Sequence, residues 1–135
     1  MIRSLAALTL STLAISACTA SLAPSPKASG AYLFDKHCTS CHGRTAEGDG
    51  PLASGFAIPP ANLTLIAQRN GGTFPTAGVM AQINGYTGRH QLGGMPEFEE
   101  VIQSPLVDWA SPSGEVIPTP QSLLALATYL ESIQQ

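Results

Sequence analysis

Apolar residues recur at helical spacing in several parts of the sequence, most clearly in "TPQSLLALATYLESIQ" near the carboxyl end. In this segment Thr119 is a suitable helix cap, and Pro120 suits the first helical turn. The apolar positions that share one face are Leu123, Leu126, Ala127 and Leu130. The spacing therefore predicts a C-terminal amphipathic helix that buries one side.

Shorter helices are predicted upstream of this segment. A first helix of about twelve residues, capped by Ser29 or a neighbour, runs into residue 38. The stretch "PANLTLIAQRNGG" indicates another helix, capped by Asn62 and stopped by Gly71. A further short helix surrounds Met80 and ends at Gly85.

The amino-terminal residues have the pattern of an export signal. Arg3 precedes an uncharged apolar stretch, Leu5 to Ala17, which is too short to span a bilayer comfortably. It ends in "ISAC", which resembles a bacterial lipoprotein signal, in which cleavage before Cys18 leaves that cysteine to be lipid-modified. The alternative is a general signal cut elsewhere, which leaves Cys18 discarded or free. We expect a signal peptide at 1–17, a lipid-anchored flexible tether at 18–29, and one domain at 30–135.

Composition and charge exclude some partners. The chain has 135 residues, 6 Lys+Arg, 9 Asp+Glu and a formal charge of −3, which becomes −4 when Arg3 leaves with the signal peptide. Nucleic acid is an unsuitable partner, because the sequence has no basic stripe and no interleaving of aromatic and basic residues. So short a chain, with 13 Gly and 11 Pro, builds a modest core that a large apolar cofactor would help to fill.

The stretch "HCTSCHG", residues 37–43, carries the most specific chemistry. Cys-x-x-Cys-His is the attachment motif of c-type haem. Residues three apart share one face of a helical turn, so Cys38 and Cys41 can form thioethers with the two vinyl groups of one porphyrin. His42 can then bind the iron from one side as an axial ligand.

Two other uses of the cysteines are less suited to the sequence. A thioredoxin-like dithiol would follow a strand, and no alternating strand pattern precedes Cys38. A structural zinc site needs four protein ligands, and His90 is the only distant candidate to join Cys38, Cys41 and a histidine. We expect His37 to be a solvated neighbour at the helix end.

From about Gly30 to Ile133 the sequence resembles the class I cytochrome c domain in its bacterial form. The matching stretches, in order, are "GAYLFDKHCTSCHG", "GDGPLA", "PPANLT", "GGMPEF" and "LLALATYLESI". The resemblance implies an all-α cytochrome c fold of small helices around one covalently bound haem c. It also implies that the first and last helices pack across each other, with Gly30 and Phe34 against Leu126 and Tyr129.

The same resemblance implies a methionine as the second axial ligand of the iron. Met95 follows two glycines and precedes a proline, which makes a loop able to approach the haem closely. Met80 lies on a helix, where a methionine usually fills the core, but Met80 and His90 both stay as alternative ligands. Pro51 resembles the family proline whose carbonyl accepts a hydrogen bond from the other ring nitrogen of His42, although a plain turn proline is the alternative.

Residues 99–118 depart from the short members of that family. They contain two apolar pieces broken by prolines, which indicate a small helix and a loose hairpin. Trp109, the only tryptophan, lies among them and would cover a haem edge, donate to a haem propionate, or pack in the core.

Together these features predict a single-haem c-type cytochrome that carries one electron at a time and is not an enzyme. We expect it on the periplasmic side of a bacterial membrane, anchored by a lipid on Cys18, or otherwise soluble in the periplasm. Its acidic charge suits redox partners with a basic docking patch. The alternatives are a gas- or peroxide-reactive haem protein in which Met95 is a weak ligand or none, and a haem subunit of a larger dehydrogenase or oxidase.

Overall fold

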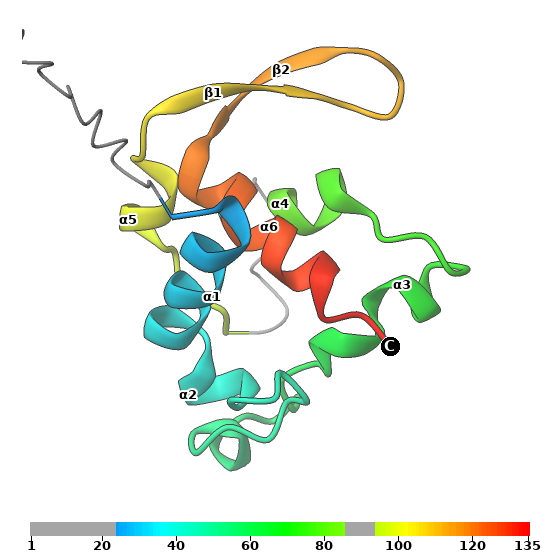
Figure 1. The fold of residues 1–135 in the computed structure, drawn as a ribbon. Coiled ribbons are helices and arrows are strands. Elements are labelled where there is room, and N and C mark those ends of the chain that lie inside the picture. Colours follow the sequence, from blue (N-terminus) through cyan, green and yellow to red (C-terminus); the bar gives the residue numbers. More distant parts are fainter. Residues whose placement is uncertain (1–23, 86–93) are drawn as a thin grey trace, which may run out of the picture.

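The computed structural model describes residues 24–85 and 94–135 (Figure 1). The predictions for Arg3, the stretch Leu5 to Ala17, Cys18 and His90 lie outside these residues. The elements in chain order are α1 (Pro26–His37), α2 (Thr39–His42), η1 (Ala53–Gly55), η2 (Leu63–Leu65), α3 (Ile66–Arg69), α4 (Thr76–Asn84), α5 (Glu99–Ile102), β1 (Leu106–Ala110), β2 (Val116–Pro120) and α6 (Gln121–Ser132).

Helices α1 and α6 cross at the centre of the fold, as the family resemblance implied (Figure 1). Gly30 allows the close approach, since a Cβ on it would lie 2.0 Å from the Ala125 carbonyl oxygen. One turn further along, the rings of Phe34 and Tyr129 lie 5.3 Å apart between centroids. Phe34 and Leu126 are almost fully buried, so this crossing forms the main core of the domain.

The first helix has the predicted length but begins earlier than predicted. Ser25, not Ser29, is the cap, because its Oγ accepts the Ala28 N–H at 3.2 Å and Pro26 suits the first helical position. Residues 26–29, predicted to belong to the tether, are therefore the first turn of α1.

The last helix buries the predicted face, but Thr119 does not cap it. Thr119 is buried in β2 and donates its hydroxyl to the Ile117 carbonyl. Ser104 and Pro105, distant in sequence, accept the first N–H groups of α6, with 2.9 Å from Ser122 N to Ser104 Oγ. A tertiary contact thus replaces the local cap that the sequence pattern predicted.

The segment after Asn62 forms two short helices, η2 and α3, where one was predicted. Asn62 caps them as predicted, since its Oδ1 accepts the Thr64 N–H at 2.9 Å. Gln134 then ties this segment to the end of α6, because its amide donates to the Leu63 carbonyl and accepts from the Ala67 N–H.

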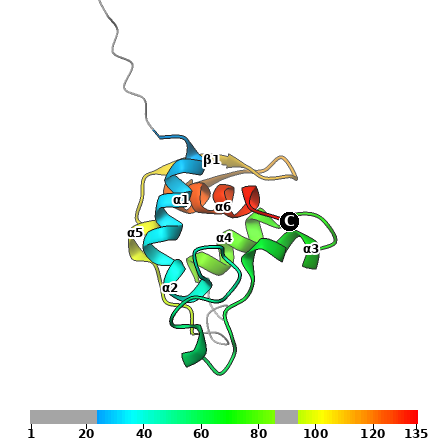
Figure 2. The same ribbon diagram turned by 60° about the horizontal axis from the view of Figure 1, so that its bottom comes forward.

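The predicted all-α class needs a correction, because β1 and β2 form an antiparallel hairpin. The hairpin and α5 fill residues 99–120 and match the small helix and hairpin expected for the insertion. Trp109 pairs with Ile117 across the strands and packs against the hydrophobic core. Figures 1 and 2 both place the hairpin at the end of the molecule away from α2.

The prediction of a membrane anchor concerns residues that the structure does not describe. Within 24–85 and 94–135, no helix has the length and apolar character needed to cross a bilayer.

Candidate functional site

A cavity of about 330 Å³ opens beside α2 and is lined mainly by apolar side chains. Its walls come from the ends of α1 and α6, from α4, from the loop before η2, and from residues 94–98. Cys38, Cys41, His42 and Met95 all lie on these walls. The structure therefore brings together the four residues that the sequence proposed for one site.

The cysteine motif forms a single helical turn, as its spacing predicts. The N–H groups of Cys41 and His42 both donate to the Cys38 carbonyl, at 3.2 and 2.8 Å. Among the described residues both cysteines are free thiols, with Cys38 buried and Cys41 half-buried. Two thiols and one imidazole are thus presented from adjacent residues at one wall of the cavity.

Burial determines the protonation state of two of these groups. It raises the pKa of the Cys38 thiol to about 12, with a smaller contribution from Cys41, so this thiol is neutral at pH 7. Burial also lowers the pKa of His42, although its backbone hydrogen bond acts in the opposite direction. A neutral imidazole is the form that binds a metal, whereas a protonated thiol is a poor redox nucleophile or zinc ligand.

The hydrogen bond on His42 differs from the predicted one. Its Nδ1 lies 3.0 Å from the Ala61 carbonyl oxygen and must donate, since a carbonyl can only accept. Pro51 is not the acceptor: it is exposed and lies beside a separate depression on the other side of α2. The bond to Ala61 leaves Nε2 with its lone pair, which orients the imidazole as a metal ligand.

Pro51 lies in a loop that packs against α2. The N–H groups of Gly50 and Leu52 donate to the carbonyls of Cys41 and Ser40, at 3.0 and 2.9 Å. A Cβ on Gly50 would lie 2.6 Å from those backbone atoms, so only glycine allows this contact. The loop therefore packs on the outer side of the cysteine turn. The carbonyl that accepts the hydrogen bond from His42 belongs to Ala61, ten residues after Pro51.

The two methionines occupy different environments. Met80 lies on α4 as predicted, is 6% exposed and belongs to the hydrophobic core, and it does not line the cavity. Met95 is half-buried and does line it. Of the methionines that the structure describes, Met95 is therefore the one available to a group in the cavity.

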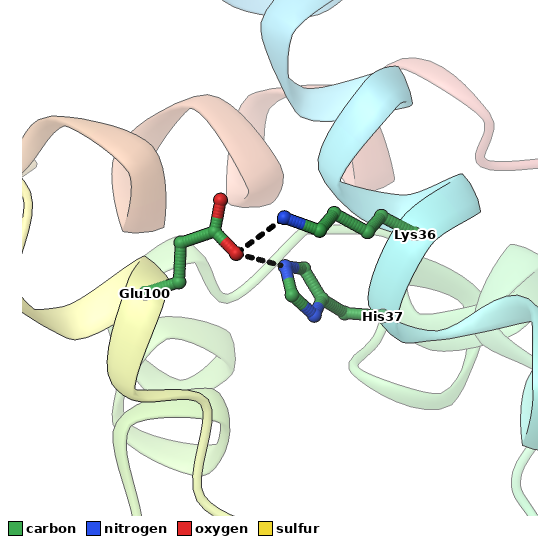
Figure 3. Close-up of polar contacts among 3 residues, drawn as sticks. All are labelled: Lys36, His37 and Glu100. Carbon is green, nitrogen blue, oxygen red and sulfur yellow. Dashed lines mark hydrogen bonds and ion pairs between the residues drawn. The ribbon is translucent and has the colours of Figure 1, made fainter.

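His37 is not the solvated neighbour that was predicted. It lines the cavity, and its ring lies edge-on to Phe98 with 6.0 Å between centroids. Its Nε2 lies 3.3 Å from Glu100 Oε2, which also accepts a hydrogen bond from Lys36 (Figure 3). The sequence carries no signal for this cluster, because α1 and α5 meet only in the folded chain.

The geometry of the described part of the chain favours neither a zinc site nor a thioredoxin-like dithiol. Cys38 follows a helix and not the strand of a thioredoxin-like motif. Within residues 24–85 and 94–135, no three His, Cys, Asp or Glu side chains gather as a metal cluster. An apolar cavity with two thiols, a neutral imidazole and a thioether on its walls instead fits haem c.

These features define a c-type cytochrome domain. The family described as "Cytochrome C oxidase, cbb3-type, subunit III" matches residues 25–109, more than half of the chain. The chain belongs to this family, and its cytochrome c domain binds haem c covalently. Searches among curated proteins and among solved structures found no match.

Proposed function

We propose that this protein carries one electron at a time through a single haem c, with His42 and Met95 as the axial ligands of the iron. The observation that supports this most directly is that Met95 lines the same cavity as Cys38, Cys41 and His42. When bound, haem supplies an iron that changes its oxidation state by one electron. With both axial positions filled by protein, no site is open to substrate, which favours electron transfer over catalysis.

The chain's own residues set the properties of the site. Cys38 and Cys41 hold the porphyrin by two thioethers, and Ala61 fixes the ring orientation of His42. A thioether ligand such as Met95 raises the reduction potential relative to a second imidazole. Apolar cavity walls exclude water, which adds to the same effect.

Substitution of the two described methionines tests the ligand assignment. The holoprotein is compared with Met95→Leu and, as a matched control, Met80→Leu, which keeps the volume of a core side chain. We expect the Met–Fe(III) charge-transfer band to disappear in Met95→Leu and to persist in Met80→Leu. A band that persists in Met95→Leu would refute the assignment and favour Met80. Fast carbon monoxide binding by the native ferrous protein would instead favour a gas-reactive site.

A second role is supported by the family description, which names a subunit of an oxidase. In that role the same haem passes electrons within a fixed complex and not between diffusing partners. Purification of the native chain in mild detergent separates the two roles. A stoichiometric oxidase that stays bound supports the subunit role, whereas a cytochrome recovered alone supports the free carrier.

The redox partner proposed here presents a basic docking patch. All 9 Asp and Glu side chains are exposed, and Glu97 lies in the sequence between Met95 and Phe98, both of which line the cavity. We expect Glu97→Gln to slow reduction by a basic partner at low salt, whereas Glu115→Gln, in the hairpin turn far from α2, has little effect. Equal rates in both variants, or rates independent of ionic strength, would contradict this docking surface.

Location at the periplasmic face of a membrane is proposed from the lipoprotein-type signal that ends at Cys18. Growth with labelled fatty acid tests it. We expect label on the native chain and none on Cys18→Ala. Absence of label from the native chain would leave a soluble periplasmic protein.

A further inference from the structure

Lys36, His37 and Glu100 form a charge cluster between the end of α1 and the start of α5, and His37 also lines the cavity (Figure 3). Lys36 Nζ donates to Glu100 Oε2 at 2.5 Å, and His37 Nε2 lies 3.3 Å from the same oxygen. Lys36 and His37 end α1 directly before Cys38, whereas Glu100 lies in the first turn of α5, shortly after Met95. The cluster therefore links the covalent attachment side of the site to the methionine side.

His37 connects the charge cluster to the cavity, because it lines the cavity together with Phe98. The His37 ring lies near both the Glu100 carboxylate and the Phe98 ring, which it meets edge-on with 6.0 Å between centroids. His37 Nε2 is buried and makes no well-oriented hydrogen bond to any described residue. The position of this imidazole therefore depends on Glu100, and Phe98 and Met95 lie on the same short stretch of chain as Glu100.

The far end of α5 is held by other means. Val101 is fully buried in the core, and Ser104 donates to its carbonyl while accepting from α6. Those contacts fix the segment after Glu100 but not the loop before it. Among the described residues, the contacts of Lys36 and His37 with Glu100 tie this end of the loop to α1.

We propose that Lys36, His37 and Glu100 act as a clasp that holds the Met95 loop, residues 94–98, against the haem. The clasp sets how readily an outside ligand replaces Met95, so its three members are positioning residues. This inference rests on the proposed function, because it needs Met95 as an axial ligand. The Lys36–Glu100 bond raises the pKa of Lys36 and lowers that of Glu100, so both groups are charged at neutral pH. Both are also partly exposed, so salt weakens their attraction.

Imidazole titration of the ferric holoprotein measures how easily the loop opens. We expect Glu100→Gln to bind imidazole about two- to five-fold more tightly than the native protein, the range that an exposed ion pair supports. Glu99→Gln is the matched control: it removes the same charge from α5, but the Glu99 carboxylate accepts its hydrogen bond from Gln103, the residue that follows the same helix. Its affinity for imidazole should equal that of the native protein.

Further variants keep the test decisive. Lys36→Gln breaks the same bond from the α1 side and should bind imidazole as tightly as Glu100→Gln does. The double variant Lys36→Glu, Glu100→Lys exchanges the two charges and should return the affinity for imidazole to that of the native protein. Higher salt should reduce the difference in imidazole affinity between the native protein and Glu100→Gln. Equal affinities in the native protein, Glu100→Gln and Lys36→Gln at low salt would overturn the clasp.

The variant Met95→Leu separates failure of the clasp from failure of the proposed function. If it binds imidazole far more tightly than the native protein while Glu100→Gln does not, the ligand assignment stands and the clasp is wrong. If it keeps both the native affinity and the charge-transfer band, Met95 is not the ligand and both proposals fail.

Discussion

Replacement of Gly30 by alanine tests whether the crossing of α1 and α6 carries the fold. The added Cβ would lie 2.0 Å from the Ala125 carbonyl oxygen and 2.7 Å from Tyr129 Cβ. Ordinary contacts of this kind begin at 3.4 Å, so α1 must move away from the backbone of α6. Overpacking of this kind costs roughly 1–3 kcal/mol, and contact with backbone, which cannot rotate away, places this site at the upper end. The better helix propensity of alanine returns about 1 kcal/mol, which leaves a net loss of about 2 kcal/mol.

Urea unfolding of the holoprotein, followed by circular dichroism, measures this loss as a lower midpoint at unchanged slope. Gly78→Ala is the matched control, because Gly78 also lies within a helix but its new Cβ would meet only Pro75, at 3.7 Å. In Gly78→Ala only the helix propensity changes, and we expect the free energy of unfolding to rise by about 0.5–1 kcal/mol. If Gly30→Ala proved as stable as the native protein, the close approach of α1 and α6 would be wrong.

Two further predictions concern polar groups around α5. Ser104→Ala should lower the free energy of unfolding by about 1 kcal/mol, because its hydroxyl is the cap of α6; a change below about 0.3 kcal/mol would show that water replaces it. The second concerns pH: the pKa of Glu100 is lowered from 4.5, mainly by the hydrogen bond from Lys36, so the native protein should be more stable than Glu100→Gln above pH 4.5. That advantage should vanish as the pH falls through the folded-state pKa, in melting curves recorded from neutral to acid pH, and an advantage that persists in acid would contradict the pairing.

Local patterns predicted the elements whose causes lie within a few residues. The spacing in Cys38, Cys41 and His42 predicted one helical turn, and the apolar face of α6 was identified residue by residue. Asn62 was recognised as a cap because its partner, Thr64, is only two residues away. Each of these features depends on backbone geometry over one or two turns, which sequence spacing encodes directly.

Features that depend on distant segments were predicted wrongly or not at all. The acceptor for His42 is a backbone carbonyl, which every residue has, so no residue type marks Ala61 in preference to Pro51. Threonine is a common helix cap, but Thr119 lies within β2. Ser104 accepts the hydrogen bond from the first turn of α6 instead. The all-α class is confirmed only in part: a hairpin was expected in this segment, but the class name left out the pairing of β1 with β2.

The site also extends beyond the part of the chain that the family match covers. The match ends at residue 109, within β1, but Leu126 and Leu130 of α6 line the cavity. Gln134 bonds the end of that helix to the segment that follows Ala61, the residue that orients His42. The histidine side of the site therefore depends on α6, and α6 depends on Ser104 for its first turn. Residues 99–118 are thus a structural support of the haem cavity, although none of them lines it.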